Sequence, residues 1–286
     1  MMRASVVVRT KDEADRLLLT LTSLAKQTQP AEIVVVNDGS TDSTPAILAE
    51  AGNWMPLRIV EHATPRGRSA ASNAGARAAS GEVVILLDGD TLAGPDMVAR
   101  HLELHAARTN VAGRGETFHI RRSNAQRITR AMILEDFATV DALSAPGIYP
   151  GSASRRIYEL EMDALHNHPT SGILWAAASG SNFSVPRATF LEVGGFLEQL
   201  DLNEHRELAL RLCKAGVSMR PVDGARSYHL IAGLRRDPSV ERAWEDVFYR
   251  AHPIPEIKRL SALWASLVEG RDVASLTEIE RTAFPC

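Results

Sequence analysis

Residues 83–90 read V-V-I-L-L-D-G-D, an apolar run that ends in two carboxylates flanking a glycine. A short continuous apolar run closed by turn residues is typical of a strand that is buried on both faces. We therefore predict a strand over 83–87, with Asp88, Gly89 and Asp90 at its carboxyl end. Gly89 has no Cβ, so a ligand can approach the backbone closely between the two acids.

Three further strands are predicted upstream, and a helix follows each of them. The strands are 4–8, 33–36 and 57–60, and the helices are 17–24, 44–51 and 69–79. This alternation indicates an α/β fold in which helices flank a mostly parallel, Rossmann-like sheet. Ligands of such sheets bind beyond the carboxyl ends of the strands, where this sequence places residues 10–13, Asp38 and the two aspartates.

The second half of the chain has weaker periodicity. Over 117–170 we expect a mixture of helix and long loop. The other predicted elements are a strand over 180–185, a short helix over 187–193, a helix over 204–215 that stops at Gly216, a strand over 226–230, and terminal helices over 239–252 and 256–268.

Composition excludes several classes of protein. The chain has 286 residues, 45% apolar and 23% charged, which is a folded rather than a disordered profile. A net charge of −3 provides no basic field for nucleic acid. No apolar run reaches the roughly 18 residues that span a bilayer, and the N-terminus lacks a signal-peptide layout. Cys213 is expected to be a buried thiol and, with Cys286, makes no disulfide or zinc pattern, so we expect a cytoplasmic protein.

The two acids at the end of the fourth strand suit a hard cation. Mg²⁺ and Mn²⁺ prefer oxygen ligands and usually retain waters and substrate phosphates. Taken alone, Asp88-Gly89-Asp90 is more typical of a solvated turn. However, residues 37–42 (N-D-G-S-T-D) follow another parallel strand, and residues 66–75 open a helix with two arginines. A helix N-terminus with guanidinium groups is a natural diphosphate site.

Five strings occur in order over the first ninety residues, and two more follow later. They are S-V-V-V-R-T-K-D-E (5–13), L-T-S-L-A-K-Q-T (21–28), E-I-V-V-V-N-D-G-S-T-D-S-T (32–44), G-R-S-A-A-S-N-A-G (67–75), A-S-G-E-V-V-I-L-L-D-G-D (79–90), V-G-G-F (193–196) and N-E-H-R-E-L (203–208). Together they resemble the family-two glycosyltransferases of the GT-A fold. The resemblance implies a GT-A domain over 1–235, with a nucleotide-binding half (1–115) and an acceptor-binding half (116–235). A C-terminal helical extension over 236–286 follows.

The resemblance also implies roles for individual residues. Contacts to a nucleotide-diphospho sugar are implied for Thr10, Asp12, Glu13, Asp38, Arg66, Arg68, Asp88 and Gly89. Asp38 matches the position at the base, Asp88 the ribose-side or metal-side acid, and Asp90 the direct ligand of Mn²⁺ or Mg²⁺. His229 resembles a late metal-binding histidine, with a partly buried strand histidine as the equal alternative. The cation would act as a Lewis acid on the leaving diphosphate.

The sequence departs from the family pattern at the catalytic base. Inverting members usually carry Glu-Asp, with the Asp as base, where this chain has Glu204-His205. Three interpretations stay open. His205 is the base, since its reference pKa near 6.5 suits that task; Glu204 is the base; or the enzyme is retaining and needs no acid there. We favour Glu204 as the more important acid. Asn37 also replaces a common Asp, and Asp12 a common Asn.

We therefore expect a metal-dependent, hexosyltransferase-type glycosyltransferase that uses a UDP-sugar rather than a GDP- or dTDP-sugar. The alternative is a catalytically silent nucleotide-sugar-binding or scaffold protein of the same fold. Residues 9–13 lack the Gly-rich loop of a sugar-nucleotidyltransferase, and the absent G-x-G-x-x-G argues against a dinucleotide enzyme.

The acceptor stays open between a peptide, a natural product, a lipid-linked carrier and a polysaccharide. Trp175 is a weak candidate for stacking on it, and a core position is at least as consistent with the sequence. The apolar stripe over 257–268 has helical spacing. We favour burial of this stripe against the domain, with a homodimer contact through the C-terminal helices as the next alternative.

Overall fold

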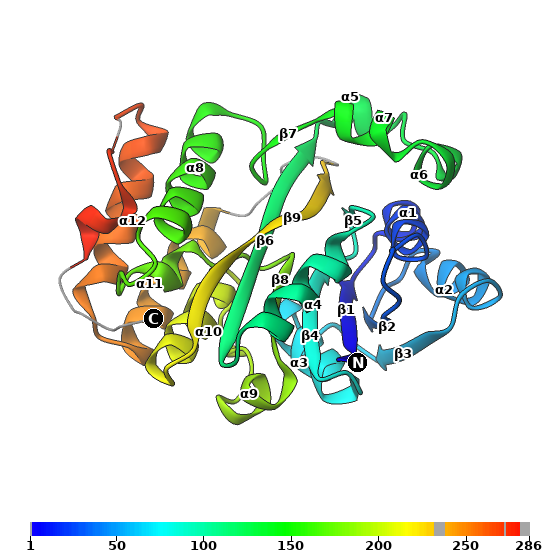
Figure 1. Ribbon diagram of the computed structural model, residues 1–286, viewed down its shortest axis with the longest axis horizontal. Coiled ribbons are helices and arrows are strands. Elements are labelled where there is room, and N and C mark those ends of the chain that lie inside the picture. Colours follow the sequence, from blue (N-terminus) through cyan, green and yellow to red (C-terminus); the bar gives the residue numbers. More distant parts are fainter. Residues whose placement is uncertain (1, 232–237, 272, 281–286) are drawn as a thin grey trace.

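The computed structural model describes residues 2–231, 238–271 and 273–280. Its centre is a nine-stranded sheet in the order β3-β2-β1-β4-β8-β6-β9-β5, with β7 paired to β6 off this path (Figure 1). Apolar side chains of β1 alternate between two cores, because Val7 belongs to one buried cluster and Val6 and Val8 to another. The sheet is therefore buried on both faces, as its continuous apolar runs indicate.

The first half forms the predicted alternation of strands and helices. Its elements are β1 (Ala4–Thr10), α1 (Ala14–Leu24), β2 (Glu32–Asp38), α2 (Thr44–Gly52), β3 (Leu57–His62), α3 (Arg68–Ala78) and β4 (Val83–Asp88). The four strands pair in parallel. The N-cap of α2 is Ser43. The carboxyl ends of β1, β2 and β4 lie at one edge of the sheet, which we call the rim.

The second half adds strands of both directions. The elements are β5 (Thr91–Ala93), α4 (Met97–Ala107), β6 (Val111–Ile120), α5 (Arg122–Ala125), α6 (Arg130–Glu135), α7 (Phe137–Ala142), β7 (Ser144–Pro146), α8 (Ser152–Asn167), η1 (Leu174–Ala177), β8 (Phe183–Pro186), α9 (Arg187–Glu192), α10 (Glu204–Lys214), β9 (Ser218–Leu230), α11 (Pro238–Ala251), α12 (Pro255–Val268) and η2 (Leu276–Ile279). β8 runs antiparallel to both β4 and β6. The mostly parallel character thus holds for β3-β2-β1-β4, and the remainder is mixed. An apolar run such as that of β8 does not reveal strand direction.

A buried polar network holds β8 between α4 and β6. His101 of α4 contacts Ser184 Oγ through Nδ1 and Asn182 Oδ1 through Nε2, both at 2.8 Å, and His105 Nε2 contacts the same Ser184 Oγ at 2.9 Å. Asn182 also donates to the carbonyls of Glu116 and Ala225. Burial lowers the pKa of each histidine to about 4, so both imidazoles are neutral at physiological pH.

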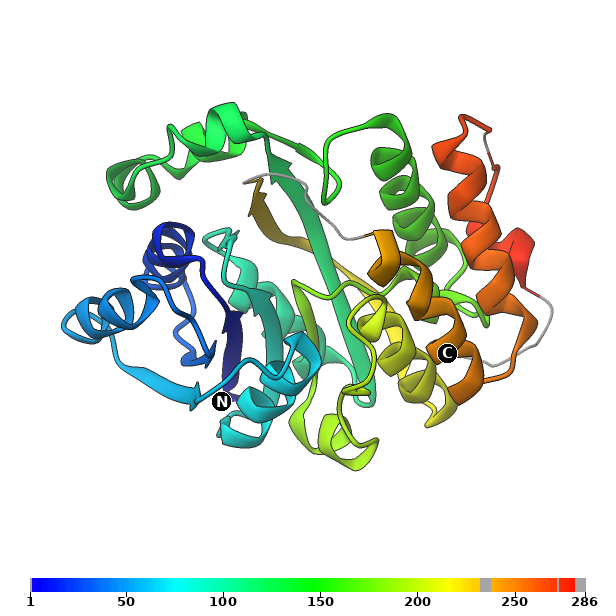
Figure 2. The same ribbon diagram turned by 180° about the vertical axis from the view of Figure 1, so that it is seen from behind.

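The C-terminal helices complete the core at the end of the molecule away from α1, α2 and β3. α11 and α12 lie beside α8 in both views (Figures 1 and 2). On α12, Ile257 and Leu260 are fully buried in the same cluster as the α8 and α10 residues. Val268 is 76% exposed. The favoured interpretation, burial of the stripe within this chain, is confirmed, and the stripe offers little surface to a second copy.

Three further predictions concern the state of Cys213, the domain boundary at 235 and membrane-spanning segments. Cys213 lies buried on α10 but is not a free thiol, which contradicts the expectation of a buried thiol. Cys286 and the predicted domain boundary at 235 lie outside the described residues. In the described part of the chain, no helix has the length and apolar character needed to cross a membrane.

Candidate active site at the carboxyl rim of the sheet

Asp88, at the end of β4, forms an ion pair with Arg9 of β1. Arg9 Nε donates to Asp88 Oδ1 at 2.6 Å, and the two residues are partners in the parallel register. Arg9 is only 8% exposed, so water screens this contact weakly. The carboxylate that was predicted to face the donor therefore has a fixed cationic neighbour.

The turn at Gly89 is covered by the segment that follows β1. A Cβ on Gly89 would lie 2.8 Å from Thr10 Cβ and Oγ1 and 2.8 Å from Glu13 Oε2. Burial and the charges of Asp90 and Asp88 raise the pKa of Glu13 to about 8, although Arg16 opposes them. The raised pKa of Glu13 therefore reflects both its burial and the two aspartates beside it, and a cation at this point would offset their charge.

Asp90 faces His229 across the rim, as the predicted metal site requires. His229 Nδ1 donates to the Ile148 carbonyl at 2.9 Å, and its Nε2 lies 3.2 Å from Asp90 Oδ2. Burial alone would lower the pKa of His229, but Asp90 raises it. Because Nε2 and a carboxylate oxygen both carry lone pairs, only a proton or a cation between them makes this contact favourable.

The donor set at this point is small. In the described residues, no group of three or more His, Cys, Asp or Glu side chains is arranged to hold a metal ion. Asp90 and His229 provide two ligand atoms, and the Ile148 carbonyl fixes the imidazole tautomer as backbone partners commonly do. Mg²⁺ is usually bound by one or two carboxylates together with substrate phosphates, so this pair fits a cation that is completed by a diphosphate.

Asp38, at the end of β2, holds the loop that leads into α3. Its Oδ1 accepts from His62 Nδ1 at 2.6 Å and from the Arg66 amide at 2.8 Å, and its Oδ2 accepts from the Gly67 amide at 2.9 Å. The Asp38 side chain is 7% exposed. This carboxylate therefore positions the start of α3, including Arg68, in addition to any contact with a base.

Two predicted nucleotide contacts lie further out on the rim. Asp12 accepts from the Thr41 amide at 2.7 Å and so connects the loop after β1 to the loop after β2. Its hydrogen bonds with Lys11 and Thr41 lower its pKa to about 2. Arg66 is half exposed and pairs with Glu198 at 3.5 Å. Both side chains remain near solvent.

Glu204 begins α10 and lies buried against the donor side of the rim. Arg9 Nη1 approaches its Oε1 at 3.2 Å, and Arg68 Nη1 lies 3.8 Å from the same oxygen. Its other oxygen, Oε2, has no hydrogen-bond partner among the described residues. Burial alone would raise the pKa of Glu204, but His205 and the charges of Arg9 and Arg68 hold it well below the usual range. The carboxylate therefore stays ionised.

His205 has one ring nitrogen engaged and one unpaired. Its Nε2 lies 2.8 Å from Arg206 Nη1, and because a guanidinium only donates, Nε2 is the acceptor. The proton of the neutral ring is then assigned to Nδ1, which lies 3.7 Å from Glu204 Oε2, beyond hydrogen-bond distance. Burial and the charge of Arg206 lower the pKa of His205. In this arrangement His205 presents an N–H rather than a lone pair.

Gly180 lies directly against these groups. A Cβ at this position would lie 3.1 Å from His205 Nδ1, 3.5 Å from Arg9 Nη2 and 3.6 Å from Glu204 Oε1. We call Arg9, Gly180, Glu204 and His205 the Gly180 cluster. The Glu204 oxygen nearest Gly180 is Oε1, whereas Oε2 lies 3.7 Å from His205 Nδ1, and neither Oε2 nor Nδ1 has a hydrogen-bond partner in the described chain.

Trp175 is not part of this site. It is fully buried within the same apolar core as α8 and α10, where its ring meets Phe248 edge-on at 5.7 Å. The prediction that it stacks on an acceptor is therefore wrong. A tryptophan in a short apolar stretch suits a core position as well as a sugar platform, and the residue type does not distinguish them.

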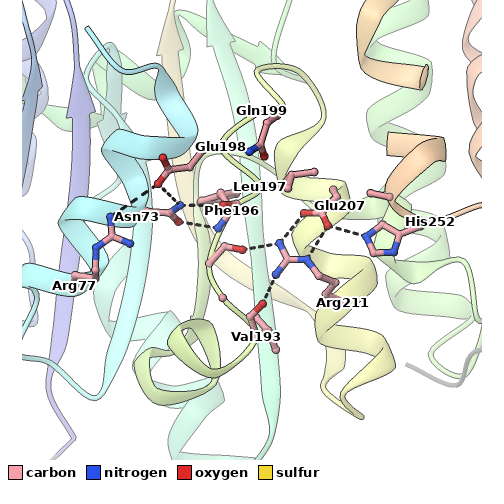
Figure 3. A pocket seen from close by; sticks show the side chains of 13 residues that line it. Asn73, Arg77, Val193, Phe196, Leu197, Glu198, Gln199, Glu207, Arg211 and His252 are labelled. Atoms are coloured by element: carbon pink, nitrogen blue, oxygen red, sulfur yellow. Dashed lines mark hydrogen bonds and ion pairs between the residues drawn. The ribbon is translucent and has the colours of Figure 1, made fainter. Parts of the chain in front are cut away.

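A separate polar pocket of about 520 Å³ lies between α3, α10 and the end of α11 (Figure 3). Arg211 pairs there with Glu207 at 2.6 Å and donates to the Gly195 carbonyl at 2.5 Å, and Glu207 accepts from His252 at 2.8 Å. Asn73 both donates to and accepts from the backbone of Phe196. Because these groups satisfy one another, they fasten the 193–199 loop to the helices and are distinct from the rim.

Sequence reasoning did not find Arg9, the residue that joins Asp88 to Glu204. A signal was present, because Arg9 is a charged residue that directly follows the apolar run V-V-V of a strand predicted to be buried. A buried guanidinium requires carboxylate partners, so its position at the rim indicates acids nearby.

Comparison with known proteins identifies the relatives of this fold and site. The profile described as Glycosyl transferase family 2 matches residues 5–157. A validoxylamine A glucosyltransferase of Streptomyces hygroscopicus subsp. jinggangensis is 30% identical over 98% of this chain and 67% of its own length. The uncharacterized glycosyltransferase YfnE of Bacillus subtilis is 26% identical over 77% of this chain and 62% of its own length. The chain thus spans about two thirds of these relatives.

Solved structures share the fold. S. aureus TarS 1-349 in complex with UDP-GlcNAc has a TM-score of 0.60 at 19% identity, over 96% of this chain and 68% of that one. The mannosyltransferase PcManGT of Pyrobaculum calidifontis, in complex with GDP-Man and Mn²⁺, has a TM-score of 0.58 at 19% identity, over 97% of this chain and 68% of that one. At this identity the likeness concerns the GT-A fold alone. The family profile covers more than half of the chain, and the chain therefore belongs to glycosyl transferase family 2 and is a glycosyltransferase.

Proposed function

We propose that this glycosyltransferase moves a hexosyl group from a UDP-sugar, with a divalent cation, to a hydroxyl of a natural-product acceptor. The observation that carries the proposal is the joint position of Asp88, Asp90 and Glu204 around Arg9 and His229 at the rim. Carboxylates at the proposed donor site and on α10 therefore lie close to one another, as transfer between two bound substrates requires.

The donor side is supported by three features of the chain. Asp38 holds the loop before α3, so that Arg68 and the α3 N-terminus are directed at a diphosphate. Asp90 and His229 would hold Mn²⁺ or Mg²⁺, which would supply Lewis-acid stabilisation of the leaving diphosphate. Thr10 and Glu13 close the turn at Gly89 beside them.

The acceptor class is inferred from the relatives and the polar groups of α10. The name of the validoxylamine A glucosyltransferase gives a glucosyl group and validoxylamine A, and that relative aligns with nearly the whole of this chain. We therefore infer a natural-product acceptor, with validoxylamine A as the first acceptor and UDP-glucose as the first donor to test. A peptide, lipid-linked or polysaccharide acceptor is the alternative.

Glu204 is our candidate for the group that meets the acceptor. Its Oε2 would accept the hydroxyl proton while Nδ1–H of His205 donates to the same oxygen atom of the acceptor. The acceptor oxygen forms a bond to the anomeric carbon, and the bond from that carbon to the diphosphate oxygen breaks. A carboxylate held this strongly ionised is a weak base, so orientation of the hydroxyl is its larger contribution.

Calorimetric titration tests the donor proposal. UDP, GDP and dTDP are each added with Mn²⁺ and again with EDTA, to wild type and to Asp90→Ala. We expect UDP to bind most tightly, and the binding to weaken at least about tenfold without metal or without Asp90. Asp163→Ala, on the exposed surface of α8, is the matched control and should bind as wild type does. Equal binding in all arms would overturn the metal and nucleotide assignments.

Hydrolysis of the bound donor separates a transferase from a silent binding protein. We expect slow release of UDP from UDP-glucose in the absence of acceptor, and faster release when validoxylamine A is added. Binding without any release of UDP, across all acceptors, would favour the scaffold alternative.

A further inference from the structure

Arg9 is an unusual residue for the end of a buried strand. Its side chain is 9% exposed, and it has two carboxylate partners on different parts of the chain, Asp88 of β4 and Glu204 of α10. Burial opposes the charged form, but the two carboxylates raise the pKa of Arg9 above its usual value. One rigid guanidinium plane thus spans the donor side and the acceptor side of the rim.

The two carboxylate oxygens of Glu204 lie in different environments. Oε1 lies 3.2 Å from Arg9 Nη1 and 3.8 Å from Arg68 Nη1, whereas Oε2 has no partner in the described chain. Because both guanidiniums act on one oxygen, the carboxylate cannot rotate without losing them. Oε2 is therefore held towards His205, whose Nδ1 lies 3.7 Å away.

Arg9 and Arg68 contribute unequally to this arrangement. The Arg68 side chain is 50% exposed, so solvent screens its charge and its longer contact is weak. Arg9 is buried, makes the shorter contact, and is itself fixed by Asp88 at 2.6 Å. Its position therefore depends on the β1–β4 register, in which Arg9 lies opposite Asp88.

We propose that Arg9 is a positioning residue of the transfer reaction: it fixes Oε1 of Glu204 and Oδ1 of Asp88 at once, and so directs Oε2 of Glu204 at the acceptor hydroxyl. The inference rests on the proposed function in one respect, that Glu204 meets the acceptor. A neutral or shorter residue at position 9 would leave the buried Glu204 carboxylate and the partly exposed Asp88 carboxylate without their shared partner.

Titration of the Glu204 carboxyl tests whether Arg9 holds this carboxylate, and the experiment does not require enzymatic activity. Carbon-13 NMR of glutamate-labelled protein follows the carboxyl signals, and the signal missing from Glu204→Gln assigns residue 204. In wild type we expect this signal not to titrate near the usual glutamate pKa of about 4.3. In Arg9→Met it should titrate at clearly higher pH, in Arg9→Lys at an intermediate pH, and in Arg68→Met close to wild type. An unchanged titration in Arg9→Met would overturn the proposal.

Kinetics of the Arg9 and Glu204 variants test the positioning part. We expect Arg9→Met to lower kcat by about 100-fold, with a smaller change in KM for the donor, because a misplacement of this size removes reactive geometry. The double variant Arg9→Met/Glu204→Gln should be no slower than Glu204→Gln, since both act through one carboxylate. Rates that multiply in the double variant would contradict the proposal. Arg77→Met, on the exposed face of α3, is the matched control.

Folding and function are kept separate in this design. Thermal unfolding is measured first for each variant, and if Arg9→Met does not fold, Arg9→Lys and the double variant, which removes the unpaired Glu204 charge, take its place. A wild type that binds no nucleotide and transfers no sugar would disprove the proposed function. The NMR titration would still decide whether Arg9 anchors Glu204.

Discussion

Gly89 shows how much the rim depends on the absence of one carbon atom. A Cβ there would lie 2.8 Å from Thr10 Cβ, and Thr10 is a stiff, buried, β-branched residue. We expect Gly89→Ala to destabilise the protein by about 1–3 kcal/mol through overpacking, and to weaken nucleotide binding because Asp88 and Asp90 must shift with the turn. Urea unfolding and calorimetry measure the two effects.

Gly52→Ala is the control for this substitution. Gly52 ends α2, and a Cβ at that position meets nothing within 4 Å. Its replacement should leave nucleotide binding unchanged and stability equal or slightly higher, because alanine has less freedom in the unfolded chain. Equal losses in the two variants would show that the tight contacts at Gly89 have no special cost.

Single residues also mark the limit of what the sequence could predict. Asp38 and Asp88 end parallel strands at one rim, as the sequence predicted, because the direction of those strands was predictable; the roles of Asp38, Asp88 and Asp90 stay predictions. Arg9 was missed, since no motif describes a guanidinium shared by residues 79 and 195 positions away in the sequence. For Trp175 the sequence left acceptor stacking and a core position open, because residue type does not determine on which side of a helix or loop the core lies, and the structure shows the core position.

At the level of elements, the loop between β3 and α3 depends on Asp38. Its carboxylate accepts from the Arg66 and Gly67 amides and from His62. In Asp38→Ala these donors lose their partner, at a cost of about 1–3 kcal/mol, and the start of α3 loosens. We expect faster hydrogen exchange at the amides of residues 66–68, together with weaker nucleotide binding.

Asp42→Ala is the matched control for the loop. Asp42 accepts from the amides of Ala14 and Thr44, so its loss should increase exchange at the starts of α1 and α2 and leave residues 66–68 protected. The interpretation of Asp38 as the anchor of the α3 entry would be abandoned if both variants exposed the same amides.

The predicted elements were most accurate where local pattern decides the structure. Gly216 ends α10 as expected, with φ of +79° and its amide bonded to the Cys213 carbonyl. The last strand was predicted over 226–230, but β9 begins at Ser218. The prediction missed its first half because polar residues and a bulge interrupt the apolar pattern there. The insertion of β8 between β4 and β6 could not be predicted, since it joins segments far apart in the chain.

For the molecule as a whole, the His101–Ser184–His105 network predicts sensitivity to mild acid. Both histidines have a folded pKa of about 4, whereas the unfolded value is near 6.5. Between these values the unfolded chain binds protons that the folded chain does not, so stability falls as the pH falls. Each histidine contributes a slope of up to about 1.4 kcal/mol per pH unit, and none above pH of about 6.5.

A variant isolates this effect from other groups. The raised pKa of Glu13 acts in the opposite direction, but it does so equally in both proteins. His105→Gln cannot titrate, so its free energy of unfolding in urea should fall less steeply than that of wild type from about pH 6.5 to 5. Parallel curves for the two proteins would mean that the folded chain admits protons to this network.

The strand order has a consequence for folding during synthesis on the ribosome. β4 ends at residue 88, but its neighbour β8 begins only at residue 183. The β4 edge of the apolar sheet β3-β2-β1-β4 therefore has no paired strand while residues 89–182 are synthesised. At typical synthesis rates of ~5–20 residues per second this interval is roughly 5–20 s. An uncovered apolar edge is a template for aggregation, so the nascent protein is most in need of a chaperone during that interval.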